Sequence, residues 1–181
     1  VRNNVFTVMS KLVALYKLNL GHGRDEMIDI ADKHNLSYTD DLIEQALMLY
    51  SVDISSRDVF DFNDMVFRPA IENNVFMYKY DYVFVDECQD LNLAQQVLLD
   101  RSLKPDGRLI AVGDPYQAIY GFAGADAESF SRLVERPNTK VLPLSVCYRC
   151  SKEVVGFAKT IVNELESFEG SPDGVVRNGV V

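Results

Sequence analysis

The chain has 181 residues, of which 48% are hydrophobic, and its formal net charge is −9 at pH 7 with a pI near 4.7. This length suffices for one ordinary domain or parts of two, and this hydrophobic fraction argues against global disorder. Because the sequence has no run of about 18 apolar residues, we expect no membrane span. The acidic balance argues against a broad basic surface for duplex DNA.

Apolar residues recur at intervals of three and four through the first 75 residues, which is typical of amphipathic helices. Gly21 and Gly23 are expected to end the first helix, since glycine commonly follows the last helical residue. We therefore predict an N-terminal helical subdomain over residues 1–75. Its helices are expected at residues 5–20, 24–34, 39–50 and 61–71, the last of them capped by Asp61 or Asn63.

Short apolar runs alternate with helical patterns from residue 80 onward. Alternating strands and helices predict a parallel α/β sheet. The strands are expected at residues 82–85, 109–112 and 140–144, with a further one beginning at 175–176. The helices are expected at residues 92–101, 129–135 and 151–165, with a turn at 104–107.

Two adjacent carboxylates, Asp86 and Glu87, directly follow the first expected strand, which we expect to be buried. Ligands of open α/β sheets bind at the carboxyl ends of such strands. One carboxylate can hold Mg²⁺ while the next orients or deprotonates a water, which is the acidic half of a nucleotide-hydrolysis site. Acidic residues at this position also commonly only cap the next helix, so the dipeptide alone does not identify a site.

Four short polar motifs follow one another along the chain. They are Phe-Asp-Phe-Asn-Asp-Met at residues 60–65, Val-Asp-Glu-Cys-Gln-Asp at 85–90, Val-Gly-Asp-Pro-Tyr-Gln-Ala-Ile-Tyr at 112–120 and Tyr-Arg at 148–149. The first is similar to an Asp-Phe-Asp-Asp-Leu element, and the others resemble three successive motifs, of superfamily 1 DNA helicases of the UvrD/Rep type. The resemblance covers about residues 59–162, and four ordered elements are far more specific than any single motif.

The resemblance implies an α/β fold: an incomplete, parallel-sheet motor lobe of the RecA-like (P-loop NTPase) type behind the helical subdomain. Residues 76–137 would form the acidic-motif half of the first RecA-like ATPase lobe, and residues 138–181 would begin the second. The implied parent is a cytoplasmic ATP-dependent DNA helicase, nucleoid-associated if bacterial, which couples hydrolysis of Mg-ATP to translocation on single-stranded DNA and duplex unwinding. Its cofactors would be Mg²⁺ and ATP. Its partners would be single-stranded DNA, a duplex junction and the remainder of the helicase motor.

The resemblance also implies roles for individual residues. Asp86 would bind Mg²⁺, and Glu87 would be the general base that activates the attacking water. Gln117 would contact the γ-phosphate and couple hydrolysis to DNA, since an amide can both donate and accept. Arg149 would reach the γ-phosphate from the second lobe and stabilise charge in the transition state. Gln89, with its neighbour Asp90, is expected to organise the surroundings of the site.

Two aromatic residues, Tyr120 and Phe122, lie where the family stacks an aromatic ring on a DNA base. Phe122 replaces a more usual Trp, and a phenyl ring still offers a stacking face. A core position for Phe122 is an equally good interpretation. Ala123 stands where many relatives have Arg, so a phosphate or inter-lobe contact is expected to be missing.

The phosphate-binding loop of such enzymes does not occur in this sequence. No Gly-x-x-x-x-Gly-Lys-[Ser/Thr] is present, and neither is any Gly-Lys dipeptide. We therefore expect little or no ATPase or unwinding activity from this chain alone, and the start at Val1 predicts an excised piece of a longer helicase. The alternative is a non-catalytic helicase-fold remnant that acts as a DNA- or protein-binding module. Retention of Asp86, Glu87, Gln117 and Arg149 together favours the catalytic parent.

Three cysteines, Cys88, Cys147 and Cys150, make a sparse and odd set that is typical of a reducing cytosol. The pair Cys147 and Cys150 has the spacing of half a zinc site or of a redox couple. No second cysteine pair or close histidine pair completes a zinc set. From the sequence, small residues flanking Tyr148 and Arg149 are the preferred interpretation.

Overall fold

The computed structural model describes residues 2–118 and 128–177. By their internal contacts these fall into two compact units, Val1–Pro137 and Asn138–Val181. No helix within the described ranges is long and apolar enough to cross a membrane.

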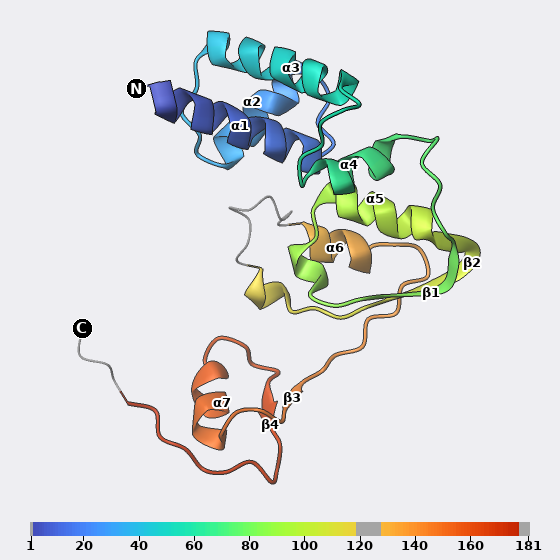
Figure 1. Cartoon of the computed structure of the whole chain (residues 1–181). Helices are drawn as coiled ribbons and strands as arrows, with labels where there is room; N and C mark the ends of the chain where they lie inside the picture. Colours follow the sequence, from blue (N-terminus) through green and yellow to red (C-terminus); the bar gives the residue numbers. More distant parts are fainter. Residues whose placement is uncertain (1, 119–127, 178–181) are drawn as a thin grey trace. The chain divides into compact units, whose positions relative to one another are not determined.

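The first unit begins with three helices that share one hydrophobic core (Figure 1). They are α1 (Arg2–Leu18), α2 (Gly23–Lys33) and α3 (Asp40–Ser55). Thr39 begins α3 by accepting a hydrogen bond from Leu42 N at 3.2 Å, which satisfies one of the free N–H groups of the first turn. The buried core residues are Leu12, Val13, Leu15, Tyr16, Met27, Ile30, Ala31, Leu42, Ile43 and Ala46. The three predicted helices are confirmed.

A short fourth helix, α4 (Asp64–Ile71), connects these helices to the strands. Asp61 caps it, because its Oδ1 accepts a hydrogen bond from Asp64 N at 2.8 Å, whereas Asn63 makes no side-chain cap bond. The carboxyl end of α4 is capped from outside by the Arg101 guanidinium, which donates to the carbonyls of Pro69 at 2.6 Å and Glu72 at 2.9 Å. Arg101 therefore ties α4 to α5, the helix in which it lies.

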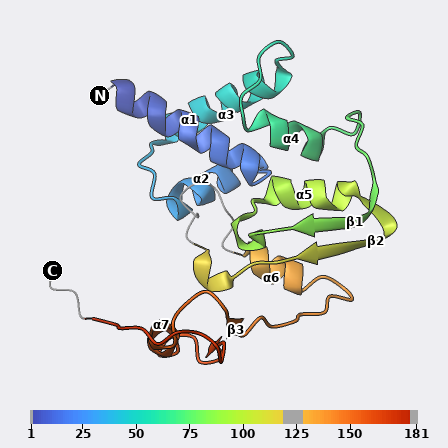
Figure 2. The same cartoon turned by 60° about the horizontal axis from the view of Figure 1, so that its bottom comes forward.

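Two parallel strands, β1 (Tyr80–Val85) and β2 (Leu103–Ala111), carry the predicted acidic motif and the motif after it. Helix α5 (Leu93–Ser102) connects the strands and runs alongside them (Figure 2). It starts with a capping box in which Asn92 and Gln95 each accept the other's backbone N–H, at 2.9 Å in both directions. A further helix, α6 (Ser129–Val134), confirms the expected helix after the second strand.

The strand pair departs from the expectations in two respects. Residues 104–107, expected as a turn, lie inside β2, where the pairing shifts from Tyr80 with Leu103 to Tyr82 with Arg108. The polar stretch is thus accommodated as an irregularity in the strand. The expected burial of the first strand is also wrong, since Phe84 is 72% exposed. In the described part of the chain only β1 and β2 form this sheet.

The second unit contains α7 (Lys152–Ala158) and a short parallel pair, β3 (Val146–Cys147) and β4 (Glu166–Ser167). The expected strand at residues 140–144 is wrong. Pro143 lacks the N–H that a ladder needs, and pairing begins only at residue 146. Helix α7 ends at Ala158 rather than 165, because the chain turns back there to pair as β4. Residues 175–176 form no strand.

Candidate active site

Asp86 and Glu87 stand directly after β1, and both side chains are exposed. Glu87 has a left-handed backbone, with φ 50° and ψ 44°, which is uncommon for a residue other than glycine. The turn is held locally, because Asp86 Oδ1 accepts a hydrogen bond from Glu87 N at 3.0 Å. Strained conformations of this kind cluster at functional sites. The chain then enters a single 3-10 turn, η1 (Cys88–Asp90).

The buried residue Cys88 fixes this turn to the end of β2. Its N–H donates to the carbonyl of Val112 at 3.0 Å, and Val112 N donates to Val85 O at 2.8 Å. On its other side, Cys88 O accepts a hydrogen bond from the buried Ser129 hydroxyl at 2.9 Å. Ser129 in turn accepts one from Gln96 of α5 at 3.0 Å. The ends of both strands and the start of α6 are therefore joined.

Gln89 connects the acidic residues to the motif after β2. Its side chain is buried; Nε2 donates to Glu87 Oε2 at 2.8 Å, and Oε1 accepts from Asp114 N at 3.0 Å. Both ends of the amide are thus used, as expected for a polar group shielded from water. Gln89 holds the Glu87 carboxylate at a defined position relative to the end of β2.

Gly113 permits the close approach of the two strand ends. A Cβ atom at this position would lie 2.6 Å from Cys88 Sγ and 2.6 Å from Gln89 Oε1. Contacts this short essentially never occur, so with any other residue the Cys88 and Gln89 side chains or the end of β2 would have to shift. The sequence therefore needs glycine here for packing rather than for an unusual backbone angle.

Gln117 joins the same network from a second 3-10 turn, η2 (Pro115–Gln117). Its Nε2 donates to Asp114 Oδ2 at 2.8 Å, while Asp114 Oδ1 caps the turn by accepting from Tyr116 N at 3.0 Å. A continuous series of hydrogen bonds thus runs from Glu87 through Gln89 and Asp114 to Gln117. Gln117 itself is exposed.

The other predicted site residues lie in the second unit or outside the described residues. Arg149 is an exposed residue of the second unit, in the bend between β3 and α7. Tyr120 and Phe122 lie outside the described residues.

Sequence reasoning assigned no role to Asp114 or Gly113 and gave Gln89 only a general one. The Gly-Asp pair at residues 113–114, one residue after β2, was the available signal for a tight contact with η1.

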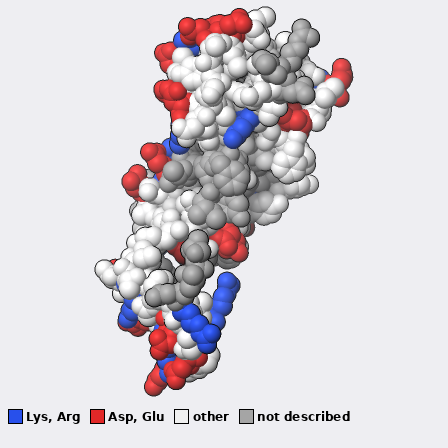
Figure 3. Space-filling model, turned by 90° about the vertical axis from the view of Figure 1, so that its left-hand side faces the viewer, with Lys and Arg blue, Asp and Glu red and all other residues white. Residues whose placement is uncertain are grey.

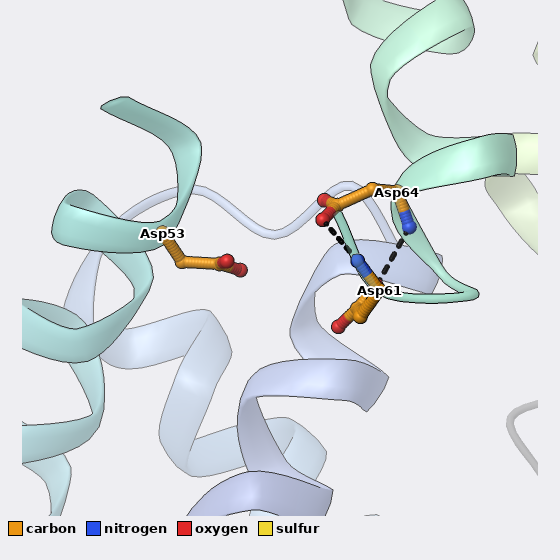
Figure 4. A group of neighbouring side chains, drawn as sticks. All are labelled: Asp53, Asp61 and Asp64. Atoms are coloured by element: carbon orange, nitrogen blue, oxygen red, sulfur yellow. Dashed lines mark hydrogen bonds between the residues drawn. The ribbon is translucent and has the colours of Figure 1, made fainter. Parts of the chain in front are cut away.

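A second group of carboxylates, from Asp53, Asp61 and Asp64, lies between α3 and α4 (Figure 4). One carboxylate oxygen of each lies within 4.8 Å of the others, which is a spacing suited to a metal ion. The ammonium of Lys17 already contacts all three, at 3.1 Å from Asp61 and 3.0 Å from Asp64 and in a closer pair with Asp53. We therefore interpret this group as a structural ion cluster.

Titration behaviour agrees with this interpretation. Burial lowers the pKa of Lys17, but its hydrogen bonds to the three carboxylates outweigh burial and leave the pKa raised. Burial alone would raise the pKa of Asp64. The hydrogen bonds from Asp61 N–H and from Lys17 outweigh burial, so the pKa of Asp64 is lowered. Both shifts favour the charged pair.

The surface charge is mixed rather than basic. On the face in Figure 3, the Lys and Arg side chains of the described residues occur singly or in small groups among Asp and Glu. This fits the net charge of −9.

The amino-acid sequence of the chain is similar to those of known helicases. A family model described as the UvrD/REP helicase N-terminal domain matches residues 13–138. The chain is 30% identical over 183 residues to the mitochondrial ATP-dependent DNA helicase HMI1 of Saccharomyces cerevisiae, covering 93% of the chain. It is 30% identical over 134 residues to the ATP-dependent DNA helicase PcrA of Staphylococcus epidermidis and over 129 residues to the ATP-dependent DNA helicase Rep of Buchnera aphidicola, covering 70% and 66% of the chain. The chain spans only 24%, 18% and 19% of these three relatives.

Proposed function

Because the chain belongs to the UvrD/Rep helicase family, we propose that it is part of an ATP-dependent DNA helicase and carries the acidic half of its nucleotide-hydrolysis site. In this proposal β1 and β2 belong to a RecA-like ATPase lobe. Single-stranded DNA, or its junction with a duplex, is the substrate track of the whole protein. The relatives named above are ATP-dependent DNA helicases, which supports the proposal.

One observation carries the proposal beyond family membership: Glu87 and Gln117 belong to a single hydrogen-bonded series through Gln89 and Asp114. A general base and a γ-phosphate sensor must respond to one another if hydrolysis is to be coupled to another event. A structure that only bound DNA would need neither a carboxylate nor an amide held in this way.

The residues after β1 are suited to Mg²⁺. Asp86 offers a carboxylate that is exposed, and hard oxygen donors are what this ion prefers. When bound, Mg-ATP would supply the phosphoryl group, and the metal would neutralise part of its charge. Asp86 would hold the ion, while Glu87, oriented by Gln89, would accept the proton of the attacking water.

The other proposed contacts to nucleotide and DNA come from the second unit and from residues outside the described ranges. Arg149, exposed in the second unit, would stabilise the charge on the γ-phosphate. Tyr120 and Phe122 would stack on bases of single-stranded DNA. These roles follow from the motifs in which the residues lie.

The test compares the 181-residue chain with the native protein that carries this sequence, isolated with antibodies raised against the chain. We expect DNA-stimulated ATP hydrolysis from the native protein and none from the chain alone, which lacks a Gly-Lys loop. In the native protein, Glu87→Gln should lower kcat by about 100-fold or more, as for loss of a general base. Glu135→Gln, an exposed change at the end of α6, is the matched control.

Two results would contradict the proposal. ATP hydrolysis by the native protein that survives Glu87→Gln would remove Glu87 from its role. A native protein that binds DNA but never hydrolyses ATP would favour the non-catalytic binding module instead.

A further inference from the structure

Asp114, the residue before η2, uses all four of its hydrogen-bonding groups. Its N–H donates to Gln89 Oε1 at 3.0 Å, and its carbonyl accepts from Gln117 N at 3.0 Å. Of its carboxylate oxygens, Oδ1 accepts from Tyr116 N at 3.0 Å and Oδ2 accepts from Gln117 Nε2 at 2.8 Å. Two of these hydrogen bonds go to Gln117, so Asp114 holds both the backbone and the side chain of that residue.

The backbone on either side of Asp114 is also constrained. Pro115 follows it as the first residue of η2, and the fixed φ of proline suits the first turn of a helix. Gly113 precedes it at a position where the neighbouring side chains leave no room for a Cβ. The Asp114 carboxylate therefore extends from a well-defined point and reaches Gln117 in a defined direction.

The chemistry of the two groups decides which end of the Gln117 amide faces Asp114. A carboxylate only accepts hydrogen bonds, whereas an amide has one end that donates and one end that accepts. The nitrogen of the Gln117 amide must therefore face Asp114, which leaves its Oε1 atom and one N–H for other partners. Gln89 is oriented by the same rule, because it lies between the Glu87 carboxylate and the Asp114 N–H.

The side chain of Asp114 has two roles that chemistry can separate. The cap of η2 needs only one acceptor, Oδ1, and asparagine supplies the same acceptor. The bond to Gln117 needs a second acceptor at Oδ2, where asparagine would place an NH2 group instead. Replacing one oxygen by NH2 therefore keeps the cap and removes the group that orients Gln117.

We propose that Asp114 is a positioning residue that fixes the orientation of the Gln117 amide, so that Oε1 and one N–H are the groups that Gln117 offers to substrate. The inference rests on the proposed function, in which Gln117 contacts the γ-phosphate. In that role the N–H donates to a γ-phosphate oxygen, and Oε1 accepts a hydrogen bond from the attacking water. The other proton of this water is the one that Glu87 removes.

The opposite orientation of the amide would have a different effect on binding than on hydrolysis. An amide turned by 180° offers two N–H groups and no acceptor to the substrate. It can still donate to a phosphate oxygen, but it can no longer accept a hydrogen bond from the water. Loss of the orientation should therefore lower kcat for ATP hydrolysis much more than it changes KM.

The test in the native protein compares Asp114→Asn with Asp114→Ala. The NH2 group of asparagine would face the nitrogen of Gln117, so the Gln117 amide must turn over, whereas alanine leaves the amide without a partner. We expect kcat to fall by about 10- to 100-fold in both variants, since misplacing a group near the reacting atoms costs about this much. The KM for ATP should change much less. Asp106→Asn, an exposed change in β2, is the matched control.

The 181-residue chain tests the bond without any ATP hydrolysis. In urea denaturation, Asp114→Asn should unfold at the same urea concentration as the unaltered chain, whereas Asp114→Ala should unfold at a lower one because only alanine loses the cap. In the NMR spectrum, one proton of the Gln117 NH2 group should be shifted downfield by its bond to the carboxylate. Asp114→Asn should remove this shift, and Gln117→Ala identifies the signal.

A native Asp114→Asn protein with unchanged kcat would overturn the proposal, because the cap alone would then explain Asp114. A rise in KM as large as the fall in kcat would also overturn it, since Asp114 would then support the whole nucleotide site. So would a Gln117 NH2 signal that Asp114→Asn leaves unchanged. If the unaltered native protein hydrolyses no ATP, the proposed function fails and the role of Gln117 toward substrate fails with it, while the NMR signal still decides whether Asp114 orients the amide.

Discussion

The ammonium of Lys17 in α1 lies 3.0 Å from the carboxylate of Asp64 at the start of α4, and neither side chain has any exposure to solvent. Asp64 also accepts the N–H of Asp61 at 2.9 Å, while Asp61 accepts that of Asp64. The upstream helicase-like motif at residues 60–65 therefore binds a buried lysine 44 or more residues earlier in the chain. In this structure the motif attaches the helical part of the first unit to the segment that leads into β1.

Replacing Lys17 by methionine should strongly destabilise the first unit. The change removes the nearer of the two cations beside the buried carboxylate of Asp64 and leaves only Arg68, whose Nε lies 3.4 Å away. Breaking a buried ion pair from one side costs about 3–5 kcal/mol. We expect a large fall in the free energy of unfolding, measured by urea denaturation. Lys11→Met, an exposed change on the same helix, should stay within about 0.5 kcal/mol. Equal effects at the two positions would show that the ion cluster contributes little.

Stability should fall on acidification because of Asp64. Its pKa in the folded chain lies below the ordinary value of 3.8, so the folded state holds the proton less tightly than the unfolded state. The stabilisation is therefore present above pH 3.8 and is lost as the pH falls through the folded pKa. Urea denaturation from about pH 7 to about pH 3 should show this acid limb.

Asp64→Asn is the control for the pH dependence. The variant should be less stable than the unaltered chain at neutral pH, and the difference should shrink as Asp64 becomes protonated. The contribution of Lys17 to stability has the opposite pH dependence. Because its pKa is raised in the folded chain, this contribution is present below pH 10.5 and is lost at higher pH. A constant difference between the two proteins across the acid range would contradict the assignment to Asp64.

The sequence was sufficient to predict the elements whose apolar pattern is regular. The helices from α1 to α3 are confirmed, because their core-facing residues repeat at helical spacing. The strands expected at 82–85 and 109–112 are confirmed as β1 and β2, the second of which ends at Ala111. The strand expected at 140–144 had the same apolar character. It is absent because pairing depends on a partner, and β4 pairs only with residues 146 and 147.

The arrangement of the candidate site was less accessible to sequence reasoning. Asp86 and Glu87 could be identified from their position after an apolar run. The bond between Gln89 and Asp114 could not, because it joins residues 25 positions apart and depends on how β1 and β2 align. The need for Gly113 has the same origin, since the atoms that exclude a Cβ belong to η1.

Replacing Gly113 by alanine should disturb the site directly. The added Cβ would meet Cys88 Sγ and Gln89 Oε1 at 2.6 Å, so these side chains or the end of β2 must shift. Overpacking of this kind costs about 1–3 kcal/mol, which urea denaturation of the chain can measure. Gly156→Ala is the matched control, because no atom lies within 4 Å of its Cβ position in α7 and alanine favours a helix there. If the Gly113→Ala chain had the same free energy of unfolding as the unaltered chain, the atoms around position 113 would accommodate a Cβ without loss of stability.

Gln89→Leu should test whether the orientation of the Glu87 carboxylate matters, because the change leaves Glu87 itself in place. Leucine removes the donor to Glu87 Oε2 and leaves Asp114 N without its acceptor, so the carboxylate keeps its charge but loses its fixed position. In the native protein we expect kcat for ATP hydrolysis to fall by roughly 10- to 100-fold, since a small misplacement of a catalytic group costs about this much. ATP binding, measured with a fluorescent analogue, should change much less. Gln45→Leu, an exposed change in α3, is the control. If Gln89→Leu weakened ATP binding as much as it lowered kcat, Gln89 would stabilise the whole site rather than orient the Glu87 carboxylate.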